Sequence, residues 1–189
     1  MLTEQQLLHD IVQGDRQAMR RLYDRYSGYA MAIVMRYVPD RDDCADVVQD
    51  AFVKIFTSVS HFEYRGEGSL KSWLSRVVAN EALQFLRKRG NISFTDDIPD
   101  DIPDDEPDIG PVSDADLRQM IASLPAGYRV VLNMYVFEQL SHKEIATQLG
   151  ISPSTSASQF FHAKKMLAKM IRQHGDPHVV KYKKEGKQQ

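Results

Sequence analysis

The stretch from Ser141 to Leu167, SHKEIATQLGISPSTSASQFFHAKKML, decides the fold of the C-terminal part of the chain. Ser141 and Glu144 have the spacing of a capping box, which begins a helix. Gly150 supplies the left-handed residue at which that helix ends, and Ser152 caps the next one. Two capped helices joined by a glycine-containing turn predict a helix-turn-helix. This motif often places its second helix in the major groove of DNA.

Two more helices are expected before this motif, at residues 114–123 and 126–137, and the first of them follows the capping pattern SDAD. Together the four helices form a predicted domain over residues 114–172. The remaining residues, 173–189, form a basic tail that we expect to be disordered.

An acidic, proline-rich segment separates this domain from the N-terminal part of the chain. Residues 95–116 hold 10 acidic residues and no lysine or arginine. Four prolines recur at every fourth position: Pro99, Pro103, Pro107 and Pro111. Repulsion between like charges and missing backbone donors favour an extended chain that cannot fold alone. We therefore expect residues 90–113 to be a flexible linker between two domains.

The N-terminal part has the pattern of a second helical domain, over residues 1–89. A capping box of Thr3 and Gln6 precedes its first predicted helix. Apolar residues at spacings of three and four predict further helices at residues 16–38, 41–58 and 70–89. The expected fold class is all-α: two small helical domains joined by an acidic, proline-rich linker, the second a helix-turn-helix domain.

The helix at residues 70–89 has two contrasting faces. Its apolar stripe has the spacing of a buried face: Leu70, Trp73, Leu74, Val77, Val78, Ala82, Phe85 and Leu86. The opposite stripe carries no acid and consists of Ser72, Arg76, Asn80, Gln84 and Arg87. This polar face can approach a polyanion without repulsion, although an ordinary solvated helix face has the same pattern.

The composition limits the remaining possibilities. Of the 189 residues 42% are apolar, enough for one or two small cores, and no apolar run has membrane-spanning length. The amphipathic, acid-containing N-terminus is unlike a signal peptide, and the single cysteine, Cys44, excludes an internal disulfide. His174 and His178 do not form a helical metal pair because Gly175 and Pro177 lie between them. We expect a cytoplasmic protein without a metal or other cofactor.

Three segments, in this order, resemble the bacterial RNA polymerase sigma factors of the extracytoplasmic-function (ECF) group. DVVQDAFVKIF at residues 46–56 resembles the family's polymerase-docking motif, and SLKSWLSRVVANEALQFLRKR at residues 69–89 resembles its promoter-melting helix. The helix-turn-helix, with LPAGYRVVLNMYVFEQL before it, resembles the family's C-terminal DNA-binding domain. The resemblance implies a transcription initiation factor that directs core polymerase to specific promoters.

The resemblance assigns residues 1–89 to polymerase docking and to recognition and melting of the minus-ten element. Asp46, Gln49, Asp50 and Phe52 are expected to contact core polymerase. Physically, the first three offer carboxylate and amide acceptors one helical turn apart. An ordinary acidic face above a core phenylalanine has the same pattern, and Phe52 is expected to serve both roles.

The same resemblance gives DNA contacts to the loop HFEYRGEGS and to the helix after it. Phe62 and Tyr64 are expected to stack on a base flipped out of the duplex, and Arg65 to approach phosphate. Alternatively, Phe62 only closes the core. The residues expected to face the opened strand are Arg76, Asn80, Arg87 and Lys88, whereas Trp73 is expected to lie in the core.

The domain at residues 114–172 is expected to recognise the minus-thirty-five element. The family often has Lys or Arg at the positions of Ala157, Gln159 and His162, and the helix here is unusually uncharged. The polar side chains left to face the groove are Thr155, Ser156, Ser158 and Gln159. Lys164 and Lys165 are expected to hold the phosphate backbone. We therefore expect this domain to bind DNA poorly without polymerase.

The partners implied are core RNA polymerase, promoter DNA and an anti-sigma factor, which in the family is often membrane-anchored; the free protein is expected to be a monomer. A self-sufficient helix-turn-helix regulator would need a dimerising surface and strong DNA binding of its own. The near-neutral first domain and the acidic segment argue against it. The sequence is not expected to be an enzyme because it lacks a metal-ligand cluster, a phosphate-cradling glycine loop and an activated nucleophile.

The uneven charge of the chain leads to a first prediction. Residues 1–94 have a net charge of +1, residues 95–116 of −10 and residues 117–189 of +7, so the acidic segment can screen the basic domain. Neutralising the acids from Asp96 to Asp108 as Asn or Gln is expected to tighten nonspecific DNA binding by the free protein. It is also expected to weaken initiation, because in the family the linker enters a basic channel of polymerase. DNA binding and run-off transcription across a salt series measure both; a passive tether predicts unchanged initiation.

Overall fold

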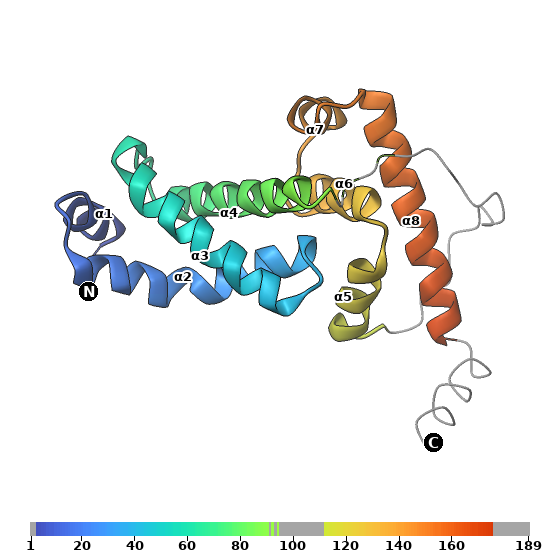
Figure 1. The fold of residues 1–189 in the computed structure, drawn as a ribbon, viewed down its shortest axis with the longest axis horizontal. Coiled ribbons are helices and arrows are strands. Elements are labelled where there is room, and N and C mark those ends of the chain that lie inside the picture. Colours follow the sequence, from blue (N-terminus) through green and yellow to red (C-terminus); the bar gives the residue numbers. More distant parts are fainter. Residues whose placement is uncertain (1–2, 91, 93, 95–111, 176–189) are drawn as a thin grey trace, which may run out of the picture. The chain divides into compact units, whose positions relative to one another are not determined.

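The chain folds into helices without a strand in the part that the computed structural model describes (Figure 1). The described residues are 3–90, 92, 94 and 112–175. The chain divides into two compact units, Met1–Asn91 and Ile92–Gln189. The predicted all-α class with two helical domains is therefore confirmed. The linker predicted at residues 90–113 lies largely outside the described residues and stays a prediction.

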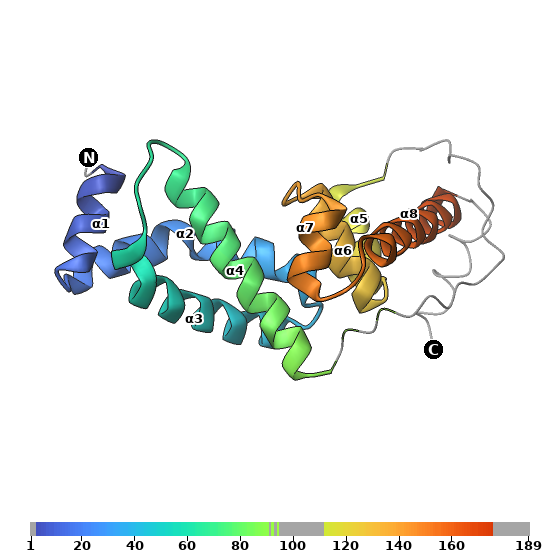
Figure 2. The same cartoon turned by 90° about the horizontal axis from the view of Figure 1, so that it is seen from above.

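The first unit contains α1 (Glu4–Val12), α2 (Arg16–Tyr37), α3 (Arg41–Ser58), a 3-10 turn η1 (Val59–His61) and α4 (Ser69–Lys88). Short polar side chains begin the first three helices: the oxygens of Thr3, Asp15 and Asp40 accept hydrogen bonds from backbone N–H groups of the first turn. Figure 2 shows α2, α3 and α4 gathered into one bundle, with α1 across its end.

The buried face of α4 differs from the predicted stripe. Five residues are buried as predicted: Leu70, Leu74, Val78, Ala82 and Leu86. Three others are only half-buried: Trp73, Val77 and Phe85. The residues buried in their place are Ala79, Glu81 and Leu83. The reason is that α4 packs against both α2 and α3, so its contact surface is rotated and wider than a single amphipathic stripe.

Two ion pairs join α3 to α4. Lys54 Nζ lies 3.1 Å from Glu81 Oε2, and Arg89 Nη1 lies 2.5 Å from Asp43 Oδ2. Glu81 is only 9% exposed, and a carboxylate buried to this extent is costly without a partner. The guanidinium of Arg89 also lies 4.6 Å from the ring centroid of Phe85. These contacts hold the two helices in one register.

The second unit contains α5 (Asp114–Ser123), α6 (Ala126–Val136), α7 (His142–Leu149) and α8 (Pro153–Gly175). The long helix α8 contacts each of the other three, and α6 and α7 also contact each other (Figures 1 and 2). One apolar core cluster of this unit consists of Ile121, Leu124, Tyr128, Leu132 and Ala163.

The C-terminal end of α8 corrects one predicted boundary. The disordered tail was predicted to begin at residue 173, but α8 continues through Gly175. His174 Nε2 lies 3.4 Å from Asp116 Oδ2 of α5, and this contact tethers the last turn of α8. Residues 176–189 lie outside the described residues, so the rest of the predicted tail is untested.

The predicted helix-turn-helix is present in α7 and α8. Ser141 accepts a hydrogen bond from the Glu144 N–H, and the Glu144 side chain accepts one from the Ser141 N–H, which completes the capping box. The Ser141 hydroxyl and the Ser141 N–H both donate to the Glu144 carboxylate, and these two hydrogen bonds lower the pKa of Glu144. Gly150 has the left-handed conformation, with φ of 70°. The Ser152 hydroxyl then accepts a hydrogen bond of 3.0 Å from the Thr155 N–H and begins α8.

A buried arginine closes the turn between α5 and α6. Arg129 Nη1 donates hydrogen bonds to the carbonyl of Ala122 at 2.9 Å and to that of Leu124 at 2.6 Å. Carbonyls at the end of a helix have no partner within the helix, so Arg129 supplies one. Burial lowers the pKa of the guanidinium, which nevertheless stays charged because the ordinary pKa of arginine is so high.

Candidate functional site

Three of the predicted site residues share one exposed face of α3. Asp46, Gln49 and Asp50 are all exposed. Because they lie three and four residues apart, their side chains are neighbours on the helix surface. The α3 face thus presents two carboxylates and an amide together, an arrangement that can accept hydrogen bonds from a basic partner.

Phe52 does not belong to this face, and the prediction that it contacts a partner is wrong. Its side chain is only 3% exposed. Its ring centroid lies 4.7 Å from that of Tyr23 and 5.9 Å from that of Phe56. Phe52 follows Asp50 by two residues, roughly 200° around the helix, and therefore points into the core. Its role is to pack α3 onto the core of the first unit.

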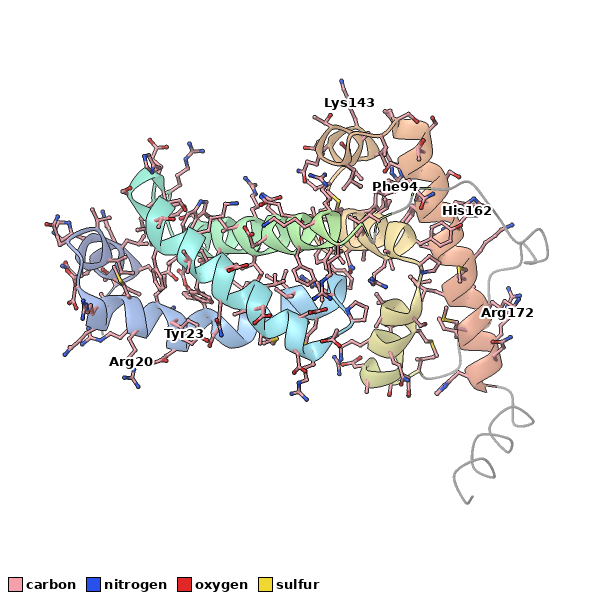
Figure 3. All side chains as sticks on the ribbon, viewed as in Figure 1. Arg20, Tyr23, Phe94, Lys143, His162 and Arg172 are labelled. Carbon is pink, nitrogen blue, oxygen red and sulfur yellow. The ribbon has the colours of Figure 1, made fainter. Side chains whose placement is uncertain are left out.

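Val53, which was not predicted, extends the α3 face, and a second large side chain, Tyr23 of α2, is exposed beside Phe52. Val53 is 63% exposed and Tyr23, on α2, is 40% exposed. Val53 lies seven residues after Asp46, so it falls on the same stripe of the helix. This spacing could have predicted from the sequence that Val53 is exposed beside Asp46. Tyr23 had no such signal, because its position beside α3 follows from the packing of Tyr23 on Phe52. Figure 3 labels Tyr23 on α2.

Four of the five residues of the predicted polar face of α4 are exposed, and Gln84 is half-buried. The α4 residues that were expected to contact DNA are all exposed: Arg76, Asn80, Arg87 and Lys88. The only acidic residue of α4 is Glu81, and it is turned inward to Lys54. The exposed surface of α4 therefore carries no negative charge, so it can lie against a polyanion.

The loop before α4 holds its aromatic residues in place. Phe62 and Trp73 are half-buried, and their ring centroids lie 4.9 Å apart with an interplanar angle of 31°. Tyr64 is also half-buried, whereas Arg65 is exposed and its Nη2 lies 2.8 Å from Glu63 Oε2. The structure thus pairs Phe62 with Trp73 and brings Tyr64 and Arg65 to the same loop.

Ser69 holds this loop instead of capping α4. Gly66 and Gly68 both have positive φ, 104° and 84°, and Gly68 is the residue before the helix. The Ser69 hydroxyl accepts a hydrogen bond of 3.2 Å from the Arg65 N–H and donates one of 2.6 Å to the Gly66 carbonyl. Gly68 precedes α4 because glycine readily takes the left-handed conformation that this position requires.

The second helix of the helix-turn-helix corrects the largest part of the predicted site. Ser156 and Gln159 have no exposed surface, and His162 is also buried. The prediction that Ser156 and Gln159 face the groove is wrong, because this side of α8 packs against α6 and α7. Ser156 Oγ instead lies 3.0 Å from His142 Nδ1 of α7. Ser156, Gln159 and His162 are therefore polar residues of the core.

A narrow strip of α8 remains on the surface. Thr155 and Ser158, which were predicted to face the groove, are half-buried. The exposed residues along the N-terminal half are Pro153, Ser154, Ala157, Phe161 and Lys164. Phe161 is 46% exposed, and Lys165 Nζ lies 4.7 Å from its ring centroid. Phe161 was not predicted as a site residue. Its spacing of seven residues from Ser154 and four from Ala157 places it on the same exposed stripe and could have identified it.

The chain is similar to proteins of one family. The family model described as Sigma-70 region 2 matches residues 22–92, and the model described as Sigma-70, region 4 matches residues 114–167. The ECF RNA polymerase sigma-E factor of Haemophilus influenzae is 30% identical over 184 residues, which cover 90% of this chain and 96% of that protein. The RNA polymerase sigma-H factor of Pseudomonas aeruginosa is 28% identical over 188 residues, with the same two coverages of 90% and 96%.

A solved structure has a similar fold. It is the sigma factor RpoE from Bartonella quintana, in complex with the anti-sigma factor NepR. The match has a TM-score of 0.52 and 20% identity, and it covers 81% of this chain and 96% of that one. In the described residues of the present chain, no helix combines the length and the apolar character that crossing a membrane requires.

The corrected exposure of α8 leads to a prediction with a matched pair of variants. Ala157→Arg adds a cation to the exposed strip and is expected to tighten DNA binding by the free chain roughly fivefold. Ser156→Arg buries the same charge and is expected to destabilise the second unit by about 3–5 kcal/mol. Ser156→Val should keep the fold. Hydrogen exchange of the α8 amides and DNA titrations measure both effects; tighter binding with intact protection in Ser156→Arg would contradict the assigned burial.

Proposed function

Because the chain belongs to the ECF group of RNA polymerase sigma factors, we propose that its two units divide the work of promoter recognition. The first unit docks on core polymerase through the α3 face and helps to open the promoter with α4. The second unit reads the upstream promoter element with α8. In this role the protein is a transcription initiation factor that acts in the cytoplasm, and the bond-forming chemistry belongs to polymerase.

The observation that carries this proposal is the distribution of charge on α4. Its basic and amide side chains lie outside, and its one acid is neutralised inside by Lys54. A single-stranded nucleic acid needs a surface of this kind, with cations for the backbone and flat or polar groups for the bases. Arg76 and Asn80 lie four residues apart and form the centre of that surface.

The loop beside α4 is suited to an unpaired base. The Phe62–Trp73 pair offers aromatic surface in this loop, Tyr64 is a further aromatic residue of the loop, and base–aromatic stacking contributes about 1–3 kcal/mol per base. Arg65 is bound only by the exposed Glu63 in this loop, and an exposed ion pair is weak. Arg65 can therefore exchange Glu63 for a phosphate at little cost.

The α3 face is suited to a basic and partly apolar surface of polymerase. Asp46 and Asp50 supply charge, which steers the encounter and fixes register. Val53 and Tyr23 supply the apolar contact that large exposed side chains gain when they lose water. We assign docking to these residues with Gln49, and give Phe52 a supporting role in the core.

The exposed strip of α8 is suited to reading the major groove with few charges. Ala157 and Phe161 are apolar, and such side chains can contact the methyl group of thymine. Thr155 and Ser158 can bind phosphate or a base edge. Lys164 and Lys165 follow along the helix and hold the backbone.

An anti-sigma factor is the further partner that we propose. NepR binds the fold-related RpoE of Bartonella quintana, and a comparable protein would cover the exposed apolar residues of the α3 face in this chain. Such a complex would exclude polymerase, since both partners would use Tyr23 and Val53. The free chain is expected to be a monomer, and co-purification from the native cell identifies the partner.

Charge reversal tests the docking role of α3. The double variant Asp46→Lys with Asp50→Lys is expected to weaken binding to core polymerase by about 2–5 kcal/mol, because it sets like charges against each other. Its melting temperature should stay close to that of the wild type, since both residues are exposed. Asp10→Lys on α1 serves as the control. Unchanged affinity for core polymerase in the folded double variant would rule out the α3 face as the docking surface.

Alanine substitution tests the melting role of α4. Arg76→Ala and Asn80→Ala are expected to keep the fold and the affinity for core polymerase, but to reduce open-complex formation on a cognate promoter by roughly tenfold, equivalent to about 1.4 kcal/mol. Permanganate footprinting measures the opened strand directly. Ser72→Ala, on the same helix nearer its start, is the matched control. If Arg76→Ala and Asn80→Ala open the promoter as well as the wild type, α4 has another function.

A further inference from the structure

We propose that Lys143, on the first turn of α7, contacts a DNA phosphate and replaces part of the charge that α8 lacks, and that the hydrogen bond between His142 and Ser156 positions it. This inference rests on the proposed function, in which α8 reads DNA. Lys143 was not among the residues that sequence reasoning selected, and it lies outside α8.

The side chain of Lys143 is available for a ligand. It is exposed, and Figure 3 shows it extending from α7 away from the rest of the second unit, at the end where α8 begins. The acid next to it, Glu144, is engaged elsewhere: its Oε2 accepts hydrogen bonds from the N–H of Ser141 at 2.8 Å and from the hydroxyl of Ser141 at 2.6 Å. The capping box thus draws the nearest negative charge away from Lys143.

The neighbour of Lys143 is fixed to the recognition helix. His142 Nδ1 lies 3.0 Å from Ser156 Oγ, and Ser156 is completely buried. The His142 ring also stacks on Tyr135 of α6, with centroids 4.7 Å apart and planes 20° apart. Consecutive Cα atoms are about 3.8 Å apart, so this bond places the backbone of Lys143 beside the N-terminal half of α8.

The need for a cation at this place follows from the sequence of α8. From Pro153 to Ala163 the helix has no lysine, arginine, aspartate or glutamate, and its first basic side chains are Lys164 and Lys165. The N-terminal residues of a recognition helix enter the groove, while the preceding helix crosses the DNA backbone. Lys143 is the only lysine or arginine of α7, so it supplies the positive charge at the backbone crossing.

The salt dependence of binding tests the proposal. The full chain is assembled with core polymerase, and the probe is a duplex that the wild-type holoenzyme selects from random-sequence DNA. A phosphate contact contributes about 0.9 to the slope of log Kobs against log salt concentration. Lys143→Met is therefore expected to reduce the slope by that amount and to weaken binding several-fold, whereas Lys143→Arg is expected to keep the wild-type slope. Arg118→Met, which removes an exposed cation from α5, is expected to leave the slope unchanged.

Two results would overturn the inference: a wild-type slope in Lys143→Met, or an equal loss in Arg118→Met, which would indicate a general effect of net charge. The positioning bond is tested by repeating Lys143→Met in a Ser156→Ala background, where the slope should change less; an equal change would show that the bond does not position the lysine. If the wild-type holoenzyme selects no DNA beyond what core polymerase selects alone, the proposed function itself fails. That outcome is distinguishable from failure of the Lys143 proposal alone, in which the wild-type holoenzyme selects DNA normally but Lys143→Met leaves the salt slope unchanged.

Discussion

The packing of α8 against α6 and α7 is the constraint on which the second unit depends. It buries one side of the recognition helix, including Ser156, Gln159 and His162, and so decides which side chains remain for DNA. A buried polar group must be hydrogen-bonded to be tolerated, and a satisfied network makes a core more specific. The bond from Ser156 to His142 is such a contact, and it ties the orientation of α8 to that of α7.

In the first unit, burial likewise decides which charged side chains remain on the surface. Lys54 neutralises Glu81 at the contact of α3 with α4, while Asp46 and Asp50 stay exposed on α3. The carboxylate of Glu81 is thereby removed from the α4 surface that is suited to nucleic acid. The carboxylates of Asp46 and Asp50 remain on the α3 surface that is suited to a basic protein. Removing Lys54 would leave the buried carboxylate of Glu81 without its partner, which is more costly than losing a fully exposed pair.

Much of the fold could be predicted because the signals that begin and end a helix involve residues close together in the sequence. Ser141, Gly150 and Ser152 act through neighbours four residues away or fewer, and all three lie where their patterns indicated. The exposure of the candidate site residues could be predicted only where it follows from helical periodicity, as for Asp46 and Asn80. The prediction of exposure failed where packing against a distant segment decides which side of a helix is buried. Serine and glutamine on a polar-looking helix are expected outside, and only the docking of His142 on α8 turns Ser156 inward.

The loop from Phe62 to Gly68 is already ordered before any ligand arrives. Two left-handed glycines, the Ser69 hydroxyl and the stacking of Phe62 on Trp73 hold it in one shape. A flexible loop would lose backbone freedom worth about 1–2 kcal/mol per residue on capturing a base, and most of that loss here has occurred during folding. The proposed base-binding loop is therefore preformed, and capture of a base would cost it little further backbone freedom.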